Sequence, residues 1–474
     1  MGVTGAGTRS GCRRRLASWL SLGLLTVSLG PAQAADADAE RSLFRQIYQE
    51  LVEIDTTHST GDTTRAARAM AQRLLDAGFP AADVQVLEPF PRKGNLVVRY
   101  RGSGDRRPML LLAHLDVVEA PRDDWTGDPF KLQERDGYFI ARGSSDNKSS
   151  GAVLVSVLSQ LRREGFVPRR DIILALTADE ERGDVPSNGA AWLVQHQRPL
   201  VDAEFGLNEG GGGVLAQGRP WVLNVQLAEK IYASFELHTR NPGGHSMAPP
   251  RANAITELAE ALVRIGGHEF PVSLSPLTRA YVERMSALSA APLASALRGL
   301  AQERPDPQAV AWLSARPGWN AVLRTTCVPT MIEGGHLENA LPQRAKATLN
   351  CRLLPDDDPA TIERTLAALA GDKVTLVRGM AAQSSPPSPL RPDIIGAIEK
   401  IAGQMWPGVP VAPTQSPGAT DSRFLRGAGI PMYGVSGLFS AGDAHEHGRD
   451  ERVQVRWLYE SREFMYRLLR ELAG

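Results

Sequence analysis

The sequence predicts an α/β protein whose main domain is interrupted by a smaller α+β domain. Short apolar runs alternate with segments of helical spacing before about residue 225 and again after about residue 385, as in a sheet covered by helices. From about residue 226 the strands instead alternate polar and apolar residues, as half-solvated strands do. With 474 residues, the chain also exceeds the roughly 250–300 residues at which single cores stop growing.

The first part of the main domain is expected over residues 35–225. Apolar spacing predicts helices at 40–51, 63–77, 151–163 and 188–197. Strands are expected at 95–100, 109–113, 138–141 and 171–178. The last of these is apolar throughout residues 172–176, which is typical of a strand buried on both faces.

The inserted domain is expected over residues 226–380, in the order β-α-β-β-α-β of a ferredoxin-like fold. Its expected elements are a strand at 232–238, a helix at 253–265, strands at 327–332 and 345–353, a helix at 361–370 and a strand at 374–377. A mostly helical stretch, about 272–318, is inserted within it. The main domain resumes over 381–474, with helices expected at 393–403 and 452–469.

Residues 1–34 have the pattern of a signal peptide. Arg13-Arg14-Arg15 is a basic region, residues 16–29 are apolar, and Ala32-Gln33-Ala34 is a small-residue cleavage site. A transmembrane anchor is the alternative, but the apolar run is short against the roughly 20 residues that a span needs. We therefore expect cleavage after Ala34 and a periplasmic or secreted protein without a stable membrane anchor.

The net charge bears on which macromolecules the protein binds, and the cysteine content bears on which residues could hold a metal. The formal net charge is +0, which gives no indication of binding to nucleic acid or to an anionic membrane surface. After cleavage Cys327 and Cys351 remain, in strand-like runs that flank the turn at Gly334-Gly335. An oxidising compartment permits a disulfide between them, and two unpaired buried thiols are an equal alternative. Neither has metal-ligand spacing, so histidines and carboxylates must hold any metal.

Ligand-type side chains follow the predicted strands of the main domain at five places. In open parallel sheets, ligands bind beyond the carboxyl ends of the strands. His114 ends the run 109–113, and Asp116, two residues on, can hold the other ring nitrogen of that histidine. The remaining candidate ligands are Asp146, the pair Glu180-Glu181, Glu209 and His447.

Each position also has an ordinary structural interpretation when taken alone. Asp146 is equally a helix N-cap, and the Asp179-Glu180-Glu181 run is equally a solvated acidic turn. Glu209 precedes four glycines that suit a flexible turn, and His447 lies in a His-rich loop with His445. Their conjunction in one domain favours two divalent metals bridged by a shared Asp, with zinc expected first and cobalt or manganese as alternatives. One Glu of the 180–181 pair would bind metal while its neighbour takes a proton from water.

These motifs resemble the di-zinc aminoacylase/carboxypeptidase family, which includes glutamate carboxypeptidase, succinyl-diaminopimelate desuccinylase and carnosinase. The resemblance covers essentially residues 40–474 and is strongest to the carboxypeptidase S group. The motifs that carry it are His114-Leu115-Asp116-Val117-Val118, Trp125-Thr126-Gly127-Asp128-Pro129-Phe130, the run 142–148, Asp179-Glu180-Glu181, Gly243-Gly244-His245-Ser246 and His447-Gly448-Arg449-Asp450-Glu451.

The resemblance implies a zinc-peptidase-like mixed sheet with a lid domain, and it implies the ligand sets. One metal would be held by His114, Asp146 and Glu209, and the other by His447, Asp146 and Glu181. Asp146 would be the bridge, and the peptide bond after it would be cis. His447 is preferred to His445 because it has the family's four-residue spacing to Glu451.

The resemblance also implies the catalytic and substrate-binding residues. Glu180 would be the general base and Asp116 would orient His114. His245, on the lid domain, would stabilise the oxyanion. The site in which it does so could be that of a neighbouring subunit. Asn339, Arg352 and the loop with Gly418 would bind the substrate's carboxylate.

The expected function is therefore that of an exported di-zinc hydrolase acting on a small peptide or an N-acyl amino acid. It would cleave the amide bond adjacent to a free carboxylate, by a metal-bridged hydroxide and the general base Glu180. A deacylase or desuccinylase of a non-peptide amide and a catalytically inactive metal-binding relative are the alternatives. A homodimer formed through the lid domain is a further expectation of the resemblance.

Overall fold

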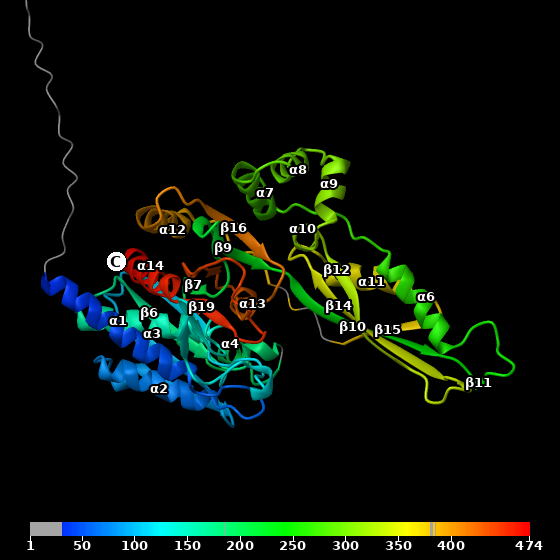
Figure 1. Ribbon diagram of the computed structural model, residues 1–474, viewed down its shortest axis with the longest axis horizontal. Helices are drawn as coiled ribbons and strands as arrows, with labels where there is room; N and C mark the ends of the chain where they lie inside the picture. The colour runs from blue at the N-terminus through cyan, green and yellow to red at the C-terminus, as the bar shows by residue number, and fades with distance from the viewer. Residues whose placement is uncertain (1–30, 184, 380–382, 384) are drawn as a thin grey trace, which may run out of the picture.

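The computed structural model describes residues 31–183, 185–379, 383 and 385–474. Residues 1–30 of the predicted signal peptide lie outside them, and the predicted cleavage site after Ala34 falls within the first helix, α1 (Pro31–Val52). Within the described residues, none of the helices has both the length and the apolar character needed to cross a membrane. Figure 1 shows a larger part with the N- and C-terminal segments and a smaller part that extends away from it.

A ten-stranded mixed sheet forms the centre of the larger part, in the order β1-β2-β6-β3-β7-β17-β9-β8-β18, with β16 paired to β9. Its strands are β1 (Val84–Phe90), β2 (Lys93–Tyr100), β3 (Arg106–His114), β6 (Arg170–Thr177), β7 (Phe205–Asn208), β8 (Gly212–Ala216), β9 (Arg219–Glu229), β16 (Val411–Ser416), β17 (Met432–Gly434) and β18 (Phe439–Ser440). The neighbours β6, β3, β7 and β17 run parallel, so their carboxyl ends meet at one edge. The predicted mixed α/β fold is confirmed.

Helices cover both faces of this sheet, which explains why its central strands are apolar throughout. Along β3, Leu111 packs into one core and its neighbour Leu110 into the other, because successive side chains point to opposite faces. The first core lies against α1, α2 (Thr63–Asp76), α3 (Lys148–Arg163), α12 (Pro392–Met405) and α14 (Val455–Ala473). The second lies against α4 (Gly189–His196), α5 (Arg198–Val201) and α13 (Ser422–Gly427).

A small three-stranded sheet and three short 3-10 helices complete the larger part. The sheet contains β4 (Gln133–Arg135), β5 (Tyr138–Ile140) and β19 (Arg452–Gln454). The 3-10 helices are η1 (Ala81–Asp83), η2 (Arg122–Asp124) and η3 (Glu180–Arg182). We expected the closing helix to begin at residue 452, and this was wrong: its first three residues pair with β5 instead, and α14 begins at Val455.

The smaller part, called here the small unit, has the predicted β-α-β-β-α-β order. Its antiparallel sheet runs β12-β14-β10-β15, built from β10 (Ile231–Arg240), β12 (Thr326–Gly334), β14 (Arg344–Leu353) and β15 (Val374–Arg378). Helices α6 (Ala254–Gly266) and α11 (Pro359–Ala370) share one core with this sheet, and β11 (Gly244–His245) pairs with β13 (Ala340–Leu341). The change from the large sheet to the small one falls at Lys230, a few residues after the expected boundary at 226.

The helical insertion belongs to the small unit in sequence but packs mainly on the large sheet. It consists of α7 (Pro276–Leu288), α8 (Leu293–Leu300), α9 (Pro307–Ser314) and α10 (Pro317–Leu323). Its helices share a core of their own, and Trp221 of β9 packs against that core. Leu277 of α7 instead belongs to the first core of the large sheet. The insertion therefore covers the β9–β16 side of the large sheet (Figure 1).

Cys327 and Cys351 lie directly opposite each other on β12 and β14 and form a disulfide. Of the two alternatives that the sequence leaves open for these cysteines, the structure therefore shows the bonded one.

Candidate active site

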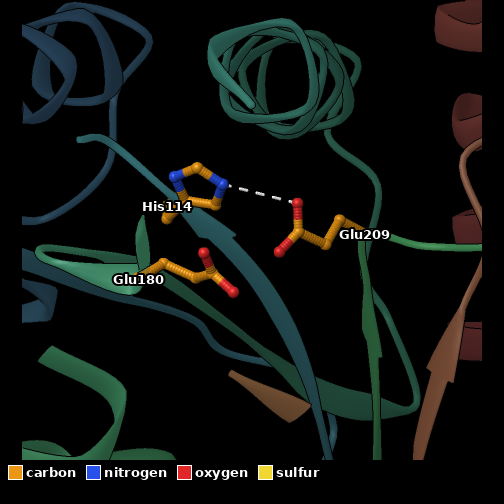
Figure 2. Close-up of side chains that lie close together, drawn as sticks. All are labelled: His114, Glu180 and Glu209. Carbon is orange, nitrogen blue, oxygen red and sulfur yellow. Dashed lines mark ion pairs between the residues drawn. The ribbon is translucent and has the colours of Figure 1, made fainter. Parts of the chain in front are cut away.

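The predicted ligand residues meet at the edge of the large sheet where the parallel strands end. His114 is the last residue of β3, Glu209 directly follows β7, and Glu180 lies on η3 after β6. Because β6, β3 and β7 are neighbours in the sheet, these three side chains face one another although they are far apart in sequence (Figure 2). Asp146 comes from the loop before α3, and His447 from the loop before β19.

The Asp146 carboxylate lies between the two histidines and directs one oxygen to each. Its Oδ1 is 3.1 Å from His114 Nε2, and its Oδ2 is 3.1 Å from His447 Nε2. Glu209 approaches His114 Nε2 at 3.4 Å, and Glu181 approaches His447 Nε2 at 3.0 Å. This is the geometry of a bridging carboxylate with one further carboxylate and one imidazole on each side.

Two overlapping groups of side chains are close enough to share a cation. In the group His114, Glu180 and Glu209, and in the group His114, Asp146 and Glu181, one ligand atom of each residue lies within 4.8 Å of the others. Imidazole and carboxylate donors without a thiolate suit zinc, manganese or cobalt.

The electrostatics of the cluster also fit a cation. Burial raises the pKa of Glu209 and Glu181, and the charge of Asp146 adds to both shifts. Hydrogen bonds to Asp146 and Glu181 raise the pKa of His447 to about 10. Burial opposes a charge on His114, yet Glu209 and its other carboxylate neighbours hold its pKa well above the usual value. These shifts reflect a concentration of carboxylates around two imidazoles, a charge distribution that divalent cations would stabilise.

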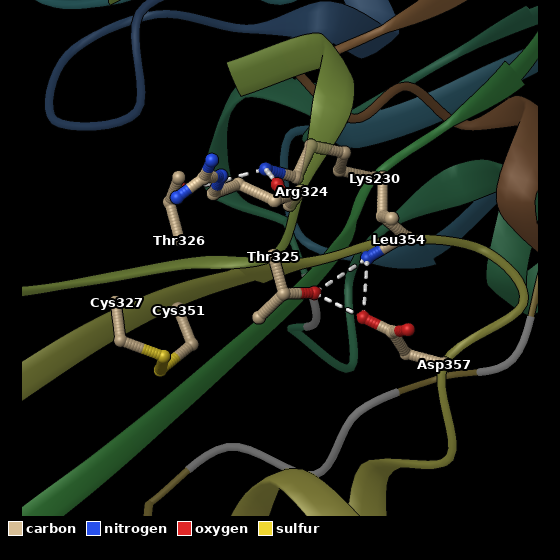
Figure 3. Close-up of a disulfide and its surroundings, with 8 residues drawn as sticks. All are labelled: Lys230, Arg324, Thr325, Thr326, Cys327, Cys351, Leu354 and Asp357. Carbon is tan, nitrogen blue, oxygen red and sulfur yellow. Dashed lines mark hydrogen bonds between the residues drawn. A yellow bond between two sulfur atoms is a disulfide. The ribbon is translucent and has the colours of Figure 1, made fainter. Parts of the chain in front are cut away.

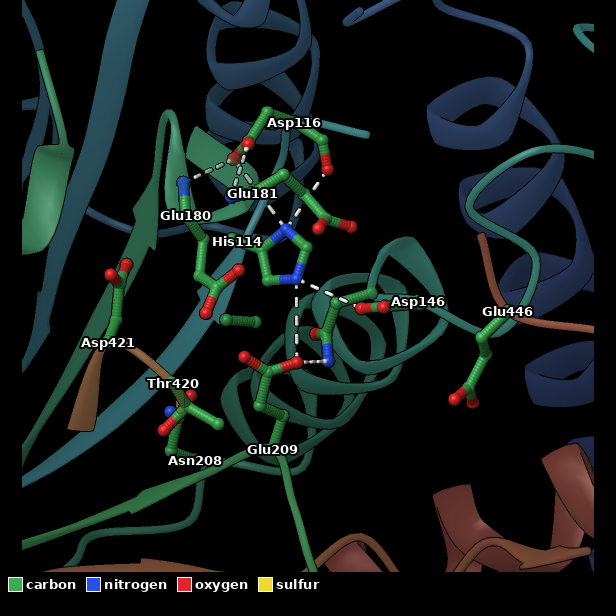
Figure 4. Close-up of polar contacts among 12 residues, drawn as sticks. His114, Asp116, Asp146, Glu180, Glu181, Asn208, Glu209, Thr420, Asp421 and Glu446 are labelled. Atoms are coloured by element: carbon green, nitrogen blue, oxygen red, sulfur yellow. Dashed lines mark hydrogen bonds and ion pairs between the residues drawn. The ribbon is translucent and has the colours of Figure 1, made fainter. Parts of the chain in front are cut away.

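Asp116 contacts both His114 and the turn that carries Glu180 and Glu181. Its backbone oxygen is 3.0 Å from His114 Nδ1, whereas its carboxylate is 3.6 Å from that nitrogen. The carboxylate also accepts the backbone N–H groups of Glu180 and Glu181, at 3.1 and 3.0 Å (Figure 4). The role of Asp116 in orienting His114 stays a prediction.

The loop that carries Asp146 is shaped by Glu451, which is fully buried. The Glu451 carboxylate accepts the backbone N–H groups of Gly143, Ser145 and Asp146 at 3.0, 2.8 and 2.9 Å. It also pairs with Arg142 Nη1 at 2.7 Å. The peptide bond between Asp146 and Asn147 is cis, as the resemblance implied. In the sequence, the only signal for Glu451 is its four-residue spacing from His447.

Other supporting residues had no signal in the sequence. Lys93 forms a buried ion pair with Asp179 at 2.6 Å, which fixes the residue just before Glu180. Asp421 accepts a hydrogen bond from Asn188 at 2.7 Å, and burial raises its pKa to about 6. Figure 4 places Asp421 beside Glu180. Each partner lies far along the chain, so no local pattern connects them.

The remaining predicted site residues lie at three different places. Gly418 lines a cavity of about 460 Å³ together with Glu180 and the candidate ligand carboxylates. Arg352, on β14, lies with its guanidinium 4.7 Å from the centre of the Tyr232 ring. His245 is on β11, at the end of the small unit that is farthest from the large sheet (Figure 1). Asn339 is close to His245, because its backbone oxygen accepts the N–H of Ser246 at 3.0 Å. The structure thus brings Gly418 to the cluster but not His245 or Asn339 of the same chain.

Comparisons with known proteins identify the family of this chain. Residues 110–471 match the sequence profile of the peptidase family M20/M25/M40. The chain is 27% identical over 459 residues to human N-fatty-acyl-amino acid synthase/hydrolase PM20D1, covering 91% of this chain and 88% of the relative. It is 28% identical over 388 residues to the probable carboxypeptidase S-like 2 of Dictyostelium discoideum, covering 79% of this chain and 74% of the relative.

A solved structure shares the fold. The M20 family metallo-carboxypeptidase Sso-CP2 from Sulfolobus solfataricus matches with a TM-score of 0.69 at 17% identity, over 91% of this chain and 99% of that one. The family profile covers most of the chain, and this protein therefore belongs to the peptidase family M20/M25/M40, as a hydrolase of the metallopeptidase type.

Proposed function

We propose that this protein hydrolyses an N-acyl amino acid or a short peptide at the amide bond next to a free carboxylate. The observation that carries the proposal is the Asp146 carboxylate set between His114 and His447, with Glu180 facing the same space. The names of the two relatives support the substrate class, since one is an N-fatty-acyl-amino acid synthase/hydrolase and the other is carboxypeptidase S-like.

Two divalent metal ions fit the cluster, with zinc proposed first. We propose that one is held by His114, Asp146 and Glu209 and the other by His447, Asp146 and Glu181. When bound, such ions supply Lewis acidity, which polarises the scissile carbonyl and makes water a stronger acid.

Glu180 is proposed to be the general base. Its carboxylate shares the cavity with the ligands, and its backbone N–H is fixed on Asp116 at 3.1 Å. Burial and the charge of Glu209 raise its pKa well above the usual value for a glutamate. A carboxylate with a raised pKa accepts a proton from the attacking water and then delivers it to the leaving nitrogen.

Gly418 and Arg352 are proposed to contact the carboxylate of the substrate. Gly418 lines the cavity beside Thr420 and Glu180. Burial lowers the pKa of Arg352, and the nearby charge of Arg423 lowers it further. An anion bound beside Arg352 would offset the cost of burying its guanidinium group.

The test is a substrate panel on the exported protein, whose first residue we propose to be Ala35. Dipeptides and N-acyl amino acids of increasing acyl length are assayed before and after chelation, and again after zinc, cobalt or manganese is restored. We expect chelator-sensitive cleavage of at least one carboxylate-bearing class. If no such substrate is cleaved by protein with two metals bound, cleavage of succinyl amides would favour the desuccinylase alternative, and complete inactivity the inactive relative.

We propose that His245 and Asn339 act in the site of a second copy, so that the small unit serves as both lid and dimerisation domain. Both residues lie at the end of the small unit that is farthest from the large sheet. The edge strand β12 also exposes three apolar side chains, Val328, Met331 and Ile332, at 53, 59 and 64%. An uncovered edge strand of this kind is a surface for pairing with another chain.

Complementation between two inactive variants tests this sharing. His245→Ala and Glu180→Gln are each expected to be inactive alone, whereas subunits mixed through refolding regain about one quarter of wild-type activity, because half of the dimers have one intact site. The control His238→Ala, on the same unit, is expected to stay active. An inactive mixture of folded subunits, or a fully active monomer, would contradict the proposal.

A further inference from the structure

The chain passes from the large sheet to the small unit through two buried charged residues, Glu229 and Lys230. Glu229 ends β9, Ile231 begins β10, and both Glu229 and Lys230 are 1% exposed. Burying a charge is costly unless it is paired and hydrogen-bonded, so the partners of these residues indicate what they do. Neither residue takes part in the chemistry proposed above. We call them the junction pair.

Glu229 holds the loop that contains Gly418. Its carboxylate accepts the backbone N–H of Thr420 at 2.8 Å and the Thr420 hydroxyl at 2.9 Å, and it pairs with Arg426. At the other end of the same loop, the backbone N–H of Lys230 donates to the carbonyl oxygen of Ser416 at 3.0 Å. Both ends of the 416–420 loop, which lines the cavity, are therefore bonded to the junction pair.

The Lys230 side chain reaches in the opposite direction, into the small unit. Its Nζ donates to the carbonyl oxygen of Arg324 at 2.7 Å and to Thr326 Oγ1 at 3.2 Å (Figure 3). Thr326 opens β12 and is the register partner of Arg352 on β14. Burial, followed by the charge of Arg352, lowers the pKa of Lys230 to about 7, so the two cations are near each other. Lys230 thus holds the strand end that adjoins Arg352.

We propose that Glu229 and Lys230 are positioning residues that keep the two halves of the substrate-carboxylate site, the 416–420 loop and Arg352, at a fixed spacing. The proposal rests on the proposed function and deepens it, because it assigns the preference for a free carboxylate to the junction between the two sheets. A misplacement of about 1 Å remote from the chemistry can lower a rate by about 100-fold, so a small shift at this junction is enough to matter.

The test compares an N-acyl amino acid with its carboxamide, which has the same scissile bond but no carboxylate. In Lys230→Met we expect kcat/KM for the acid to fall by about tenfold, mainly through KM, while the value for the carboxamide stays within about twofold. Thr326→Val removes only the hydroxyl that Lys230 contacts and is expected to shift the ratio in the same direction. The matched control is Lys346→Met, on the same strand as Arg352, where the lysine pairs with Glu236 at 3.6 Å; it is expected to keep the wild-type ratio.

Two results would overturn the positioning role. One is an unchanged acid-to-carboxamide ratio in folded variants, and the other is an equal loss on both substrates, which indicates a general structural defect. Thr326→Val decides the question if Lys230→Met does not fold. A wild-type enzyme that hydrolyses amides without preferring the acid would instead refute the carboxylate site itself, and with it the proposed function.

Discussion

Replacing Glu180 by Gln is expected to lower kcat by a factor of about 10²–10⁴, the usual contribution of a general acid–base group. Gln has nearly the same shape but cannot accept the proton of the attacking water. The backbone N–H of residue 180 would still donate to Asp116, so the turn that carries Glu181 is expected to keep its place. Metal content is therefore expected to stay at the wild-type level.

Metal analysis and steady-state kinetics on the same preparation check this expectation. A suitable control is Glu446→Gln, because Glu446 lines the same cavity and accepts a hydrogen bond from Ser145 without belonging to the proposed ligand sets. We expect that variant to keep activity within about tenfold of wild type. Near-wild-type turnover in Glu180→Gln would remove Glu180 from the role of base, and loss of metal would make it a ligand instead.

Replacing Glu451 by Gln is expected to weaken metal binding by about 10–100-fold, as is usual for residues that orient a ligand. The carboxylate accepts three backbone N–H groups of the 143–146 loop and balances the buried charge of Arg142. An amide has one acceptor oxygen and no charge. The loop would lose part of its support, and Arg142 would be left as an unpaired buried cation, which is strongly destabilising.

Chelator competition measures the metal affinity, and thermal unfolding of the metal-free protein measures the effect on the fold. Glu463→Gln is the matched control, because Glu463 pairs with Arg467 at 2.6 Å on the exposed side of the same helix α14, and such surface pairs contribute little to stability. Equal metal affinity in Glu451→Gln and wild type would show that the Asp146 loop keeps its shape without the carboxylate.

The parts of the fold that could be predicted are those whose pattern lies within a short stretch of sequence. The apolar run 172–176 identifies β6 because a strand covered on both faces needs an apolar side chain at every position. The β-α-β-β-α-β order of the small unit follows from local periodicity in the same way. By contrast, β8 begins with two glycines and β16 contains Pro413, so neither has a strong strand pattern. Both strands form because they pair with β9. The sequence gives no local sign of the pairing with β16, since β16 lies far along the chain from β9.

The sequence by itself determined the candidate ligand residues, because His114, Glu180 and Glu209 follow strands whose apolar pattern is local, and Asp146 and His447 lie in short polar motifs. Only the tertiary structure decided what surrounds those ligands. The contacts from Glu451 to the Asp146 loop and from Glu229 to Thr420 join segments that no short-range pattern relates. The same holds for His245, whose distance from the cluster depends on how the small unit extends from the large sheet (Figure 1). Strand and helix periodicity reflects local burial, whereas pairing between distant buried charges depends on which elements the completed fold brings into contact.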